Sequence, residues 1–291
     1  MSERVDKKWV DRGIDSYSTE AILGTLGHYG VEMTEARYLE LAKTMFPLAI
    51  AQEWHDQWKG TGQFSRFPAA AAEELWSRFK KGELAPTDLA LTLIGLLGSL
   101  DGALSGKADD GTWDSRFKMV EAYIPKIPTE PKTRERFMVE TLAAVGDEWS
   151  QVFDGMPEAL AQKGHPALAD RLVSVDEGLF PEHQGVMRAV VKAAKGDKPA
   201  AIADLTAIAN DTSRIPFARL GAATGLMELG HFDVKAPLIA LLDEAEKKRD
   251  VDLAGETVEA LRSWLEHGKP ERKDADELRG RIEQLVQTFN G

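Results

Sequence analysis

The amino-acid sequence predicts an all-α protein built as an array of helical hairpins. Apolar residues recur at intervals of three and four along most of the 291 residues, the spacing that places them on one face of a helix. No segment shows a sustained alternation of apolar and polar residues, and no Asn-Gly or Asp-Gly pair separates β-branched runs. Short turns containing Gly, Pro or Asp separate the helical segments, which favours helices packed in succession.

Four helices are predicted in the first part of the chain. Thr34 is expected to cap the first, and Pro47 to end or kink it before the second. Pro68 is expected to begin the third helix, and Thr87 to cap the fourth, the apolar run Leu89–Leu100. The apolar faces predicted for the first three helices are, in order, Tyr38, Leu41, Ala42 and Met45; Ile50, Trp54 and Trp58; and Ala72, Leu75, Trp76 and Phe79.

The chain is predicted to fold as an N-terminal helical domain, residues 1–124, and a second helical domain, residues 134–291. Between them lies the sequence IPKIPTEPKT, whose three prolines cannot continue a helix and favour an extended chain. We therefore expect a joint at residues 125–133. Aromatic residues are more frequent before this joint than after it, so the two cores are expected to differ in composition.

The second domain has a regular succession of predicted helices and a repeated unit. The string AVVKAAKGDKPAAIADL, which begins at Ala189, is echoed by TGLMELGHFDVKAPLIALL from Thr224, an offset of about 34 to 36 residues that is typical of stacked helical pairs. The predicted helices are Met187–Ala194, Pro199–Ala209, Phe217–Leu229, Val234–Ala245, Val251–Leu265 and Ala275–Phe289. The fourth and fifth carry the apolar faces Val234, Leu238, Leu241, Leu242 and Ala245, and Val251, Ala254, Val258, Leu261 and Leu265.

The small residues of LGAATGLMELG, followed by DVKAPLIALL, resemble the short HEAT-like repeats of helical solenoids. The resemblance covers about residues 185–267 and implies an α-solenoid architecture. A glycine inside a helix costs about 1 kcal/mol relative to alanine, yet the segment carries both Gly221 and Gly225. In a solenoid these glycines, with Ala218 and Ala222, would let neighbouring helices approach closely.

Composition excludes several classes of function. The net charge of −12 disfavours nucleic-acid binding, because neutralising phosphates requires a basic surface, and it favours a basic protein or peptide as the partner. The chain has no cysteine, so thiolate metal sites and cysteine nucleophiles are excluded. Its first residues lack the apolar segment of a signal peptide, and the run Leu89–Leu100 is shorter than the ~20 residues that span a bilayer. We therefore expect a cytoplasmic protein with no membrane segment and no cofactor.

The segment Glu53–Phe67 is the strongest candidate for a binding site. Trp54, Trp58, Phe64 and Phe67 alternate there with polar and charged residues, a composition typical of interaction hot spots. In the alternative interpretation these aromatics are core side chains between helices. Trp54 and Trp58 would share one helix face, and Phe64 and Phe67 are the two expected at the surface.

A metal site is the other chemical candidate. The adjacent His55 and Asp56, with His28 upstream, resemble the ligands of the His-Asp family of metal-dependent phosphohydrolases, and that resemblance implies one or two metal ions that activate water. In the alternative interpretation these residues bind no metal: His55 lies at the edge of an apolar helix face, and Asp56 is exposed to solvent.

The sequence favours a non-catalytic function. We expect a cytoplasmic scaffold or regulatory module that binds a protein or peptide through an extended helical-repeat surface, because such arrays act through many side chains and need no compact motif. An inhibitory or toxin-neutralising role is one special case. The alternative is a helical metal-dependent phosphohydrolase that uses His28, His55 and Asp56.

Overall fold

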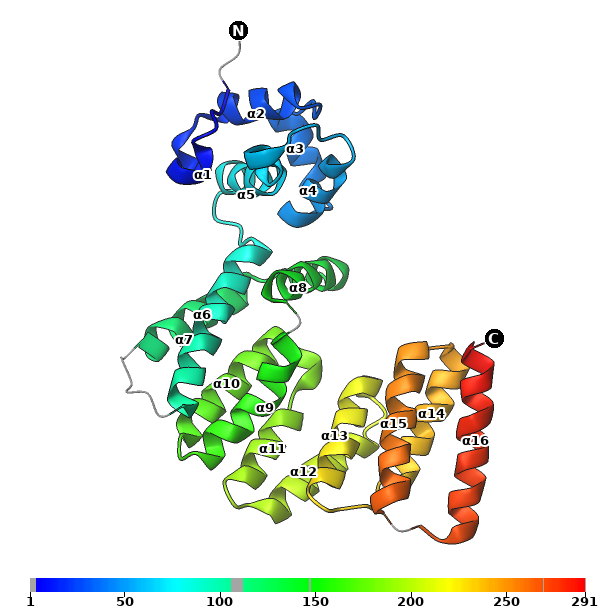
Figure 1. Ribbon diagram of the computed structural model, residues 1–291. Helices are drawn as coiled ribbons and strands as arrows, with labels where there is room; N and C mark the ends of the chain where they lie inside the picture. The colour runs from blue at the N-terminus through cyan, green and yellow to red at the C-terminus, as the bar shows by residue number, and fades with distance from the viewer. Residues whose placement is uncertain (1–3, 106–111, 147, 269, 291) are drawn as a thin grey trace. The chain divides into compact units, whose positions relative to one another are not determined.

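The computed structural model describes residues 4–105, 112–146, 148–268 and 270–290 (Figure 1). Every regular element in these ranges is a helix, so the predicted all-α class is confirmed. The chain divides into two compact units, Met1–Val152 and Phe153–Gly291, and each is described by itself.

The first unit is a series of α-helices joined by loops and short 3₁₀ turns. The elements are α1 (Trp9–Arg12), η1 (Ile14–Ser16), α2 (Thr19–His28), α3 (Glu35–Leu41), α4 (Pro47–His55), η2 (Gly62–Phe64), α5 (Phe67–Phe79), α6 (Pro86–Leu104), α7 (Thr112–Tyr123), η3 (Ile124–Lys126) and α8 (Pro131–Val145), where η denotes a 3₁₀ helix.

The predicted helix ends are confirmed in part. The Thr34 hydroxyl accepts a hydrogen bond from the Arg37 N–H at 3.2 Å, as expected of a cap. Pro47 lies in the first turn of α4, where the missing N–H costs nothing, so it begins a helix and does not end one. The prediction that Thr87 caps α6 is wrong: Ala85 is the N-cap, and the Thr87 hydroxyl donates to Glu73 of α5 instead.

Helix α8 follows the proline-containing segment 125–133 and contacts helices that precede this segment. The Leu48 N–H donates to the Glu140 carboxylate at 3.1 Å, so a side chain of α8 satisfies the N-terminus of α4. The Phe137 ring meets Phe46 edge-on at 5.3 Å, and α8 packs along α6. Because of these contacts, the compact units divide after Val152, whereas the sequence analysis placed the joint at residues 125–133.

The segment 125–133 is compatible with helical structure because two of its three prolines lie in the first turns of helices. Pro131 occupies the first turn of α8, and the Glu130 carboxylate accepts the N–H groups of Lys132 and Thr133 at 3.2 and 2.7 Å. Ile127 is buried. The segment is thus a tight connection between η3 and α8.

Within the described ranges, one helix has the length and hydropathy needed to cross a membrane, namely α6. Core helices meet the same criterion, and α6 buries an inner face of Leu89, Leu93, Leu96 and Leu100. Its opposite face exposes Leu91 and Ile94.

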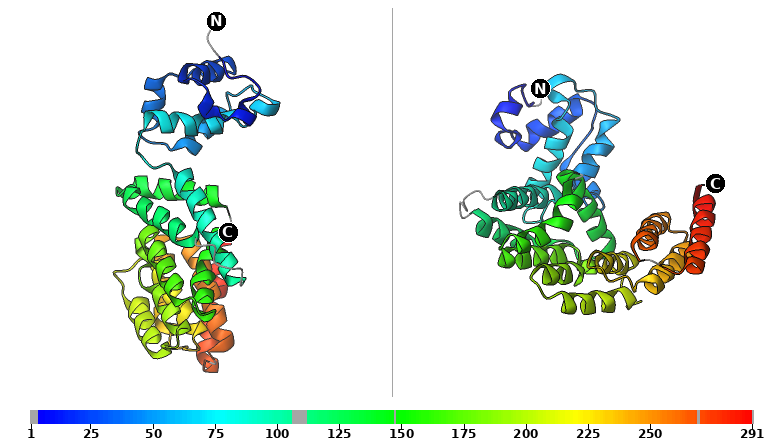
Figure 2. Two further views of the ribbon diagram at one scale, coloured as in Figure 1. Left: turned by 90° about the vertical axis from the view of Figure 1, so that its left-hand side faces the viewer. Right: turned by 60° about the horizontal axis from the view of Figure 1, so that its bottom comes forward.

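The second unit is a succession of helices from the end of α9 onward. The elements are α9 (Glu148–Gln162), α10 (Pro166–Leu179), η4 (Pro181–His183), α11 (Val186–Ala194), α12 (Lys198–Asn210), α13 (Pro216–Glu228), α14 (Lys235–Lys248), α15 (Val251–His267) and α16 (Arg272–Asn290). Each helix from α10 to α15 packs against the next one in sequence, and α13 also packs against α11 and α15. Figure 2 shows the same order in its green-to-red colours.

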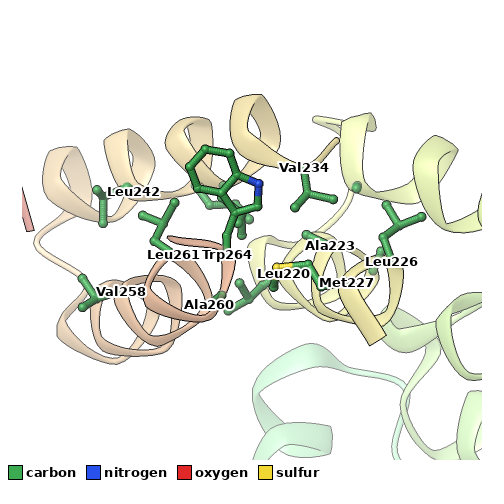
Figure 3. Close-up of a cluster of buried hydrophobic side chains, with 14 of the residues drawn as sticks. Leu220, Ala223, Leu226, Met227, Val234, Leu242, Val258, Ala260, Leu261 and Trp264 are labelled. Atoms are coloured by element: carbon green, nitrogen blue, oxygen red, sulfur yellow. The ribbon is translucent and has the colours of Figure 1, made fainter. Parts of the chain in front are cut away.

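The core of this unit lies between α13, α14 and α15 (Figure 3). The Trp264 indole N–H donates to the Phe232 carbonyl at 2.8 Å, which fixes α15 to the turn before α14. All five residues of the face predicted from Val234 to Ala245 are buried. On the α15 face, Val251 is exposed because it is the first residue of the helix, so its predicted burial is wrong.

The glycines of α13 lie against the preceding helices. A Cβ atom built on Gly225 would lie 3.4 Å from Leu205 of α12 and 3.7 Å from Val190 of α11. One on Gly221 would lie 3.7 Å from Val186. These distances leave room for a methyl group and little more.

Candidate functional site

Three of the four aromatic residues predicted as partner contacts, Trp58, Phe64 and Phe67, belong to one ring cluster, whereas the Trp54 ring packs against Tyr38. Trp58 stacks on Phe67 at 5.8 Å, Phe64 lies 5.8 Å from the same ring, and Tyr29 at the end of α2 contacts both Trp58 and Phe64. The Trp58 indole N–H donates to the Phe64 carbonyl at 3.0 Å. The segment between α4 and α5 is therefore folded onto α2 by its own aromatics.

The four predicted contact residues differ in how deeply they are buried. Trp54, Phe64 and Phe67 are buried, so the expectation that Phe64 and Phe67 lie at the surface is wrong. The cause is the 3₁₀ turn η2 together with the Lys59 N–H, which donates to the Tyr29 carbonyl at 2.9 Å and directs the segment inward. Trp58 follows the end of α4 and is half-buried, so it does not share a helix face with Trp54. A partner contact through Trp58 stays a prediction.

The residues of the predicted metal site lie at separate helix ends. His28 ends α2, and its Nδ1 lies 2.9 Å from a guanidinium nitrogen of Arg4, a cation where the resemblance would place a metal. His55 ends α4 and Asp56 follows it; both are exposed. Among the described residues no group of three His, Asp or Glu could hold a metal ion, so His28, His55 and Asp56 are not brought together.

A pocket of about 510 Å³, lined by α5, the connection that follows it and the first turn of α6, contains Glu73, a carboxyl group with a strongly raised pKa. The Thr87 hydroxyl donates to Glu73 at 2.7 Å. Burial raises the pKa of Glu73 to about 6, and the charges of Asp88 and Glu140 act in the same direction, while the Thr87 hydrogen bond opposes them. The lining residues are Ile14, Ala70, Glu73, Glu74, Trp76, Ser77, Lys80, Gly82, Glu83, Ala85 and Asp88.

The other carboxylates of this pocket have partners of their own. Glu74 pairs with Arg78 at 2.6 Å, Glu83 pairs with Lys80 at 2.8 Å, and Asp88 accepts the Ala85 N–H at 3.3 Å. Sequence reasoning missed this site. The available signal was Glu73 itself, a charged residue next to Ala72 on the predicted apolar face of its helix.

A second concave surface lies between α4 and α8. This α4–α8 groove has a volume of about 710 Å³, and most of its accessible surface is apolar although charged side chains of α8 also line it. Val139, in the middle of α8, lines this groove and is 61% exposed. The lining residues are Thr44, Met45, Leu48, Ala49, Gln52, Lys132, Glu135, Arg136, Val139, Glu140 and Ala143.

The pKa of Glu73 gives a prediction for stability. Because this pKa is about 6 in the folded chain against an ordinary value of 4.5, the folded state binds more protons between these pH values. Stability should therefore fall as the pH rises through this window, by about 1–2 kcal/mol after allowance for solvent screening. Glu73→Gln should remove this loss, so that the variant is more stable than the wild type at pH 8 and equal to it at pH 4.5.

Urea unfolding at pH 4.5, 6 and 8 measures this effect. Glu74→Gln is the matched control, because its carboxylate pairs with Arg78 and its loss should not stabilise the protein at pH 8. Equal stabilities of wild type and Glu73→Gln at pH 8 would show that the Glu73 carboxylate is well solvated.

No protein-family model, characterised protein or solved structure matches this chain. Its function is therefore inferred from its own residues and their geometry.

Proposed function

We propose that the protein is a non-catalytic cytoplasmic binding module, a scaffold or regulator that holds a protein or peptide partner. The observation that carries the proposal is the α4–α8 groove, whose apolar walls and exposed Val139 provide a surface for the apolar face of a partner segment. Helix-in-groove recognition uses such a surface, and the apolar side chains at its centre supply most of the affinity. The net charge of −12 favours a basic partner through long-range attraction.

The proposal includes a HEAT-like arrangement of residues 185–267. Two observations support it: each of these helices packs against its neighbours in sequence, and α13 approaches α11 and α12 closely at its two glycines. Such an array would offer an extended surface of its own. An inhibitory role remains a special case of the same function. The metal-dependent phosphohydrolase is not proposed, because no observation on the described residues favours it.

Val139→Asp tests the groove. The change places a charge among apolar walls, and it should weaken the partner at least tenfold while leaving the melting temperature nearly unchanged, since Val139 is exposed in the free protein. Val251→Asp is the matched control, because Val251 is a comparably exposed helical valine, 58% against 61%, in the other unit.

The measurement is capture of partners from the native cell by wild type and both variants. We expect a basic protein that the wild type and Val251→Asp retain and Val139→Asp loses. Identical sets of captured proteins on all three would contradict the groove as the binding site.

A further inference from the structure

We propose that the partner segment in the α4–α8 groove is an amphipathic helix, and that a Glu or Asp side chain of this helix binds Lys132 and Arg136. The groove as a binding site comes from the proposed function, on which this inference rests. What is added is the chemistry of the bound segment: a carboxylate at one end of the groove, and apolar side chains against Val139 and Ala143 at the other.

The α8 side of the groove is cationic at one end and apolar at the other. Four lining residues of α8 follow one another at intervals of four, three and four, so they form a stripe along one side of the helix; they are Lys132, Arg136, Val139 and Ala143. All four are exposed. With about 3.6 residues in each turn, Lys132 lies roughly two turns from Val139. One bound segment can therefore contact the cations and the apolar residues together.

Neither cation forms an ion pair within the described ranges. The Arg136 guanidinium donates to the carbonyl groups of Thr44 and Lys132 and to the Thr133 hydroxyl, all of which are uncharged acceptors. The Lys132 ammonium has no carboxylate partner in the same ranges. Like charges one helical turn apart repel each other, and a carboxylate between them would relieve this repulsion.

The carboxylates of the chain that lie near these cations are directed to other groups. Glu130 accepts backbone N–H groups in the first turn of α8, and Glu140 accepts the Leu48 N–H of α4. Glu135 also lines the groove, but it lies about 140° around α8 from Glu140, the residue that reaches α4. Glu135 is therefore at the outer edge of the groove, and the inner cationic end is open to a carboxylate from a partner.

A carboxylate on a helix fits this arrangement. Arg136 uses three of its five N–H groups in the contacts above, so donors remain for an oxyanion, and the Lys132 ammonium adds a point charge. An amphipathic helix places a charged side chain and an apolar side chain two turns apart on one face, which matches the spacing of Lys132 and Val139. The net charge of −12 attracts a basic protein at long range, and the carboxylate is a local requirement of its docking helix.

Two synthetic peptides test the proposal by calorimetric titration of the full chain. Both are blocked, alanine-rich helices with leucines on one face, and they differ only at a position two turns from the central leucine, where one has Glu and the other has Lys. The titrations are made at about 0.15 M salt, which screens attraction beyond about 8 Å. We expect the Glu peptide to bind about fivefold more tightly than the Lys peptide, the upper end for a partly exposed ion pair.

Exchange of charge between protein and peptide locates the contact. In Lys132→Glu the preference should reverse, so that the Lys peptide binds about fivefold more tightly. Lys81→Glu is the matched control, because it changes the net charge equally at an exposed lysine outside the groove, and it should leave the preference as in the wild type. Both variants should keep the wild-type melting temperature, since both lysines are exposed.

Four results would overturn the proposal. They are equal affinities of the two peptides for the wild type, an unchanged preference in Lys132→Glu, the same reversal in Lys81→Glu, and failure of both peptides to bind at about 1 mM, a very weak affinity.

Val139→Asp distinguishes these failures from failure of the proposed function. If both peptides bind the wild type equally and Val139→Asp abolishes the binding of both, the groove holds an apolar helix and only the carboxylate contact is wrong. If the Glu peptide is preferred and Val139→Asp binds it as tightly as the wild type does, the peptide lies outside the apolar part of the groove, and this proposal is wrong as well.

Discussion

Replacing Phe64 by Ala should lower the free energy of unfolding by about 3–5 kcal/mol, the usual cost of removing a buried aromatic side chain. Phe64 is 6% exposed, and its ring contacts those of Tyr29 and Phe67. The loss leaves a cavity in the middle of the ring cluster that joins α2 to α5. Urea or thermal unfolding of the two proteins measures the difference directly.

Phe217→Ala provides the matched comparison, because Phe217 lies at the exposed start of α13 and is 44% exposed. Its loss should cost much less than that of Phe64. If Phe64→Ala left the free energy of unfolding unchanged and weakened partner binding, Phe64 would be a surface contact. That result would contradict its place in the core.

Gly225→Leu should destabilise the protein by about 1–3 kcal/mol through overpacking. Only the first side-chain carbon fits at this position, since it would already lie 3.4 Å from Leu205 and 3.7 Å from Val190. The remaining atoms of leucine must displace α11 or α12. Gly225→Ala, by contrast, should be close to neutral, because a methyl group fits and alanine favours the helix.

Gly255→Leu controls for the change in helix propensity. Gly255 lies inside α15 and is exposed, and a Cβ atom there would meet nothing within 4 Å. This variant should be neutral or slightly more stable than the wild type. If Gly225→Leu and Gly255→Leu had equal melting temperatures, close helix approach would not explain the glycines of α13.

The helices were predictable because periodicity and capping are local. Thr34 caps its helix through a side chain three residues from its partner, and the face from Val234 to Ala245 repeats within one helix. Thr87 shows the limit of such signals: its hydroxyl had a long-range acceptor, Glu73, which competed with the local capping role.

The candidate sites depended on contacts that no local pattern contains. Phe64 and Phe67 have polar neighbours in sequence, and their burial follows from the return of the chain to Tyr29. The pKa of Glu73 is raised chiefly because its side chain is buried, and the charges of Asp88 in α6 and Glu140 in α8 act in the same direction. Likewise, the groove is lined by residues of α4 and α8, which lie far apart in the sequence and are connected by the hydrogen bond from the Leu48 N–H to Glu140.

Site-specific photo-crosslinking tests the central claim, that a partner occupies the α4–α8 groove. A photoreactive amino acid is placed at position 139 in one sample and at position 251 in another, and both proteins are irradiated with extract of the native cell. We expect a crosslinked product from position 139, containing a peptide of a basic protein, and none from position 251. Products from position 251 alone, or equal products from both positions, would contradict the claim.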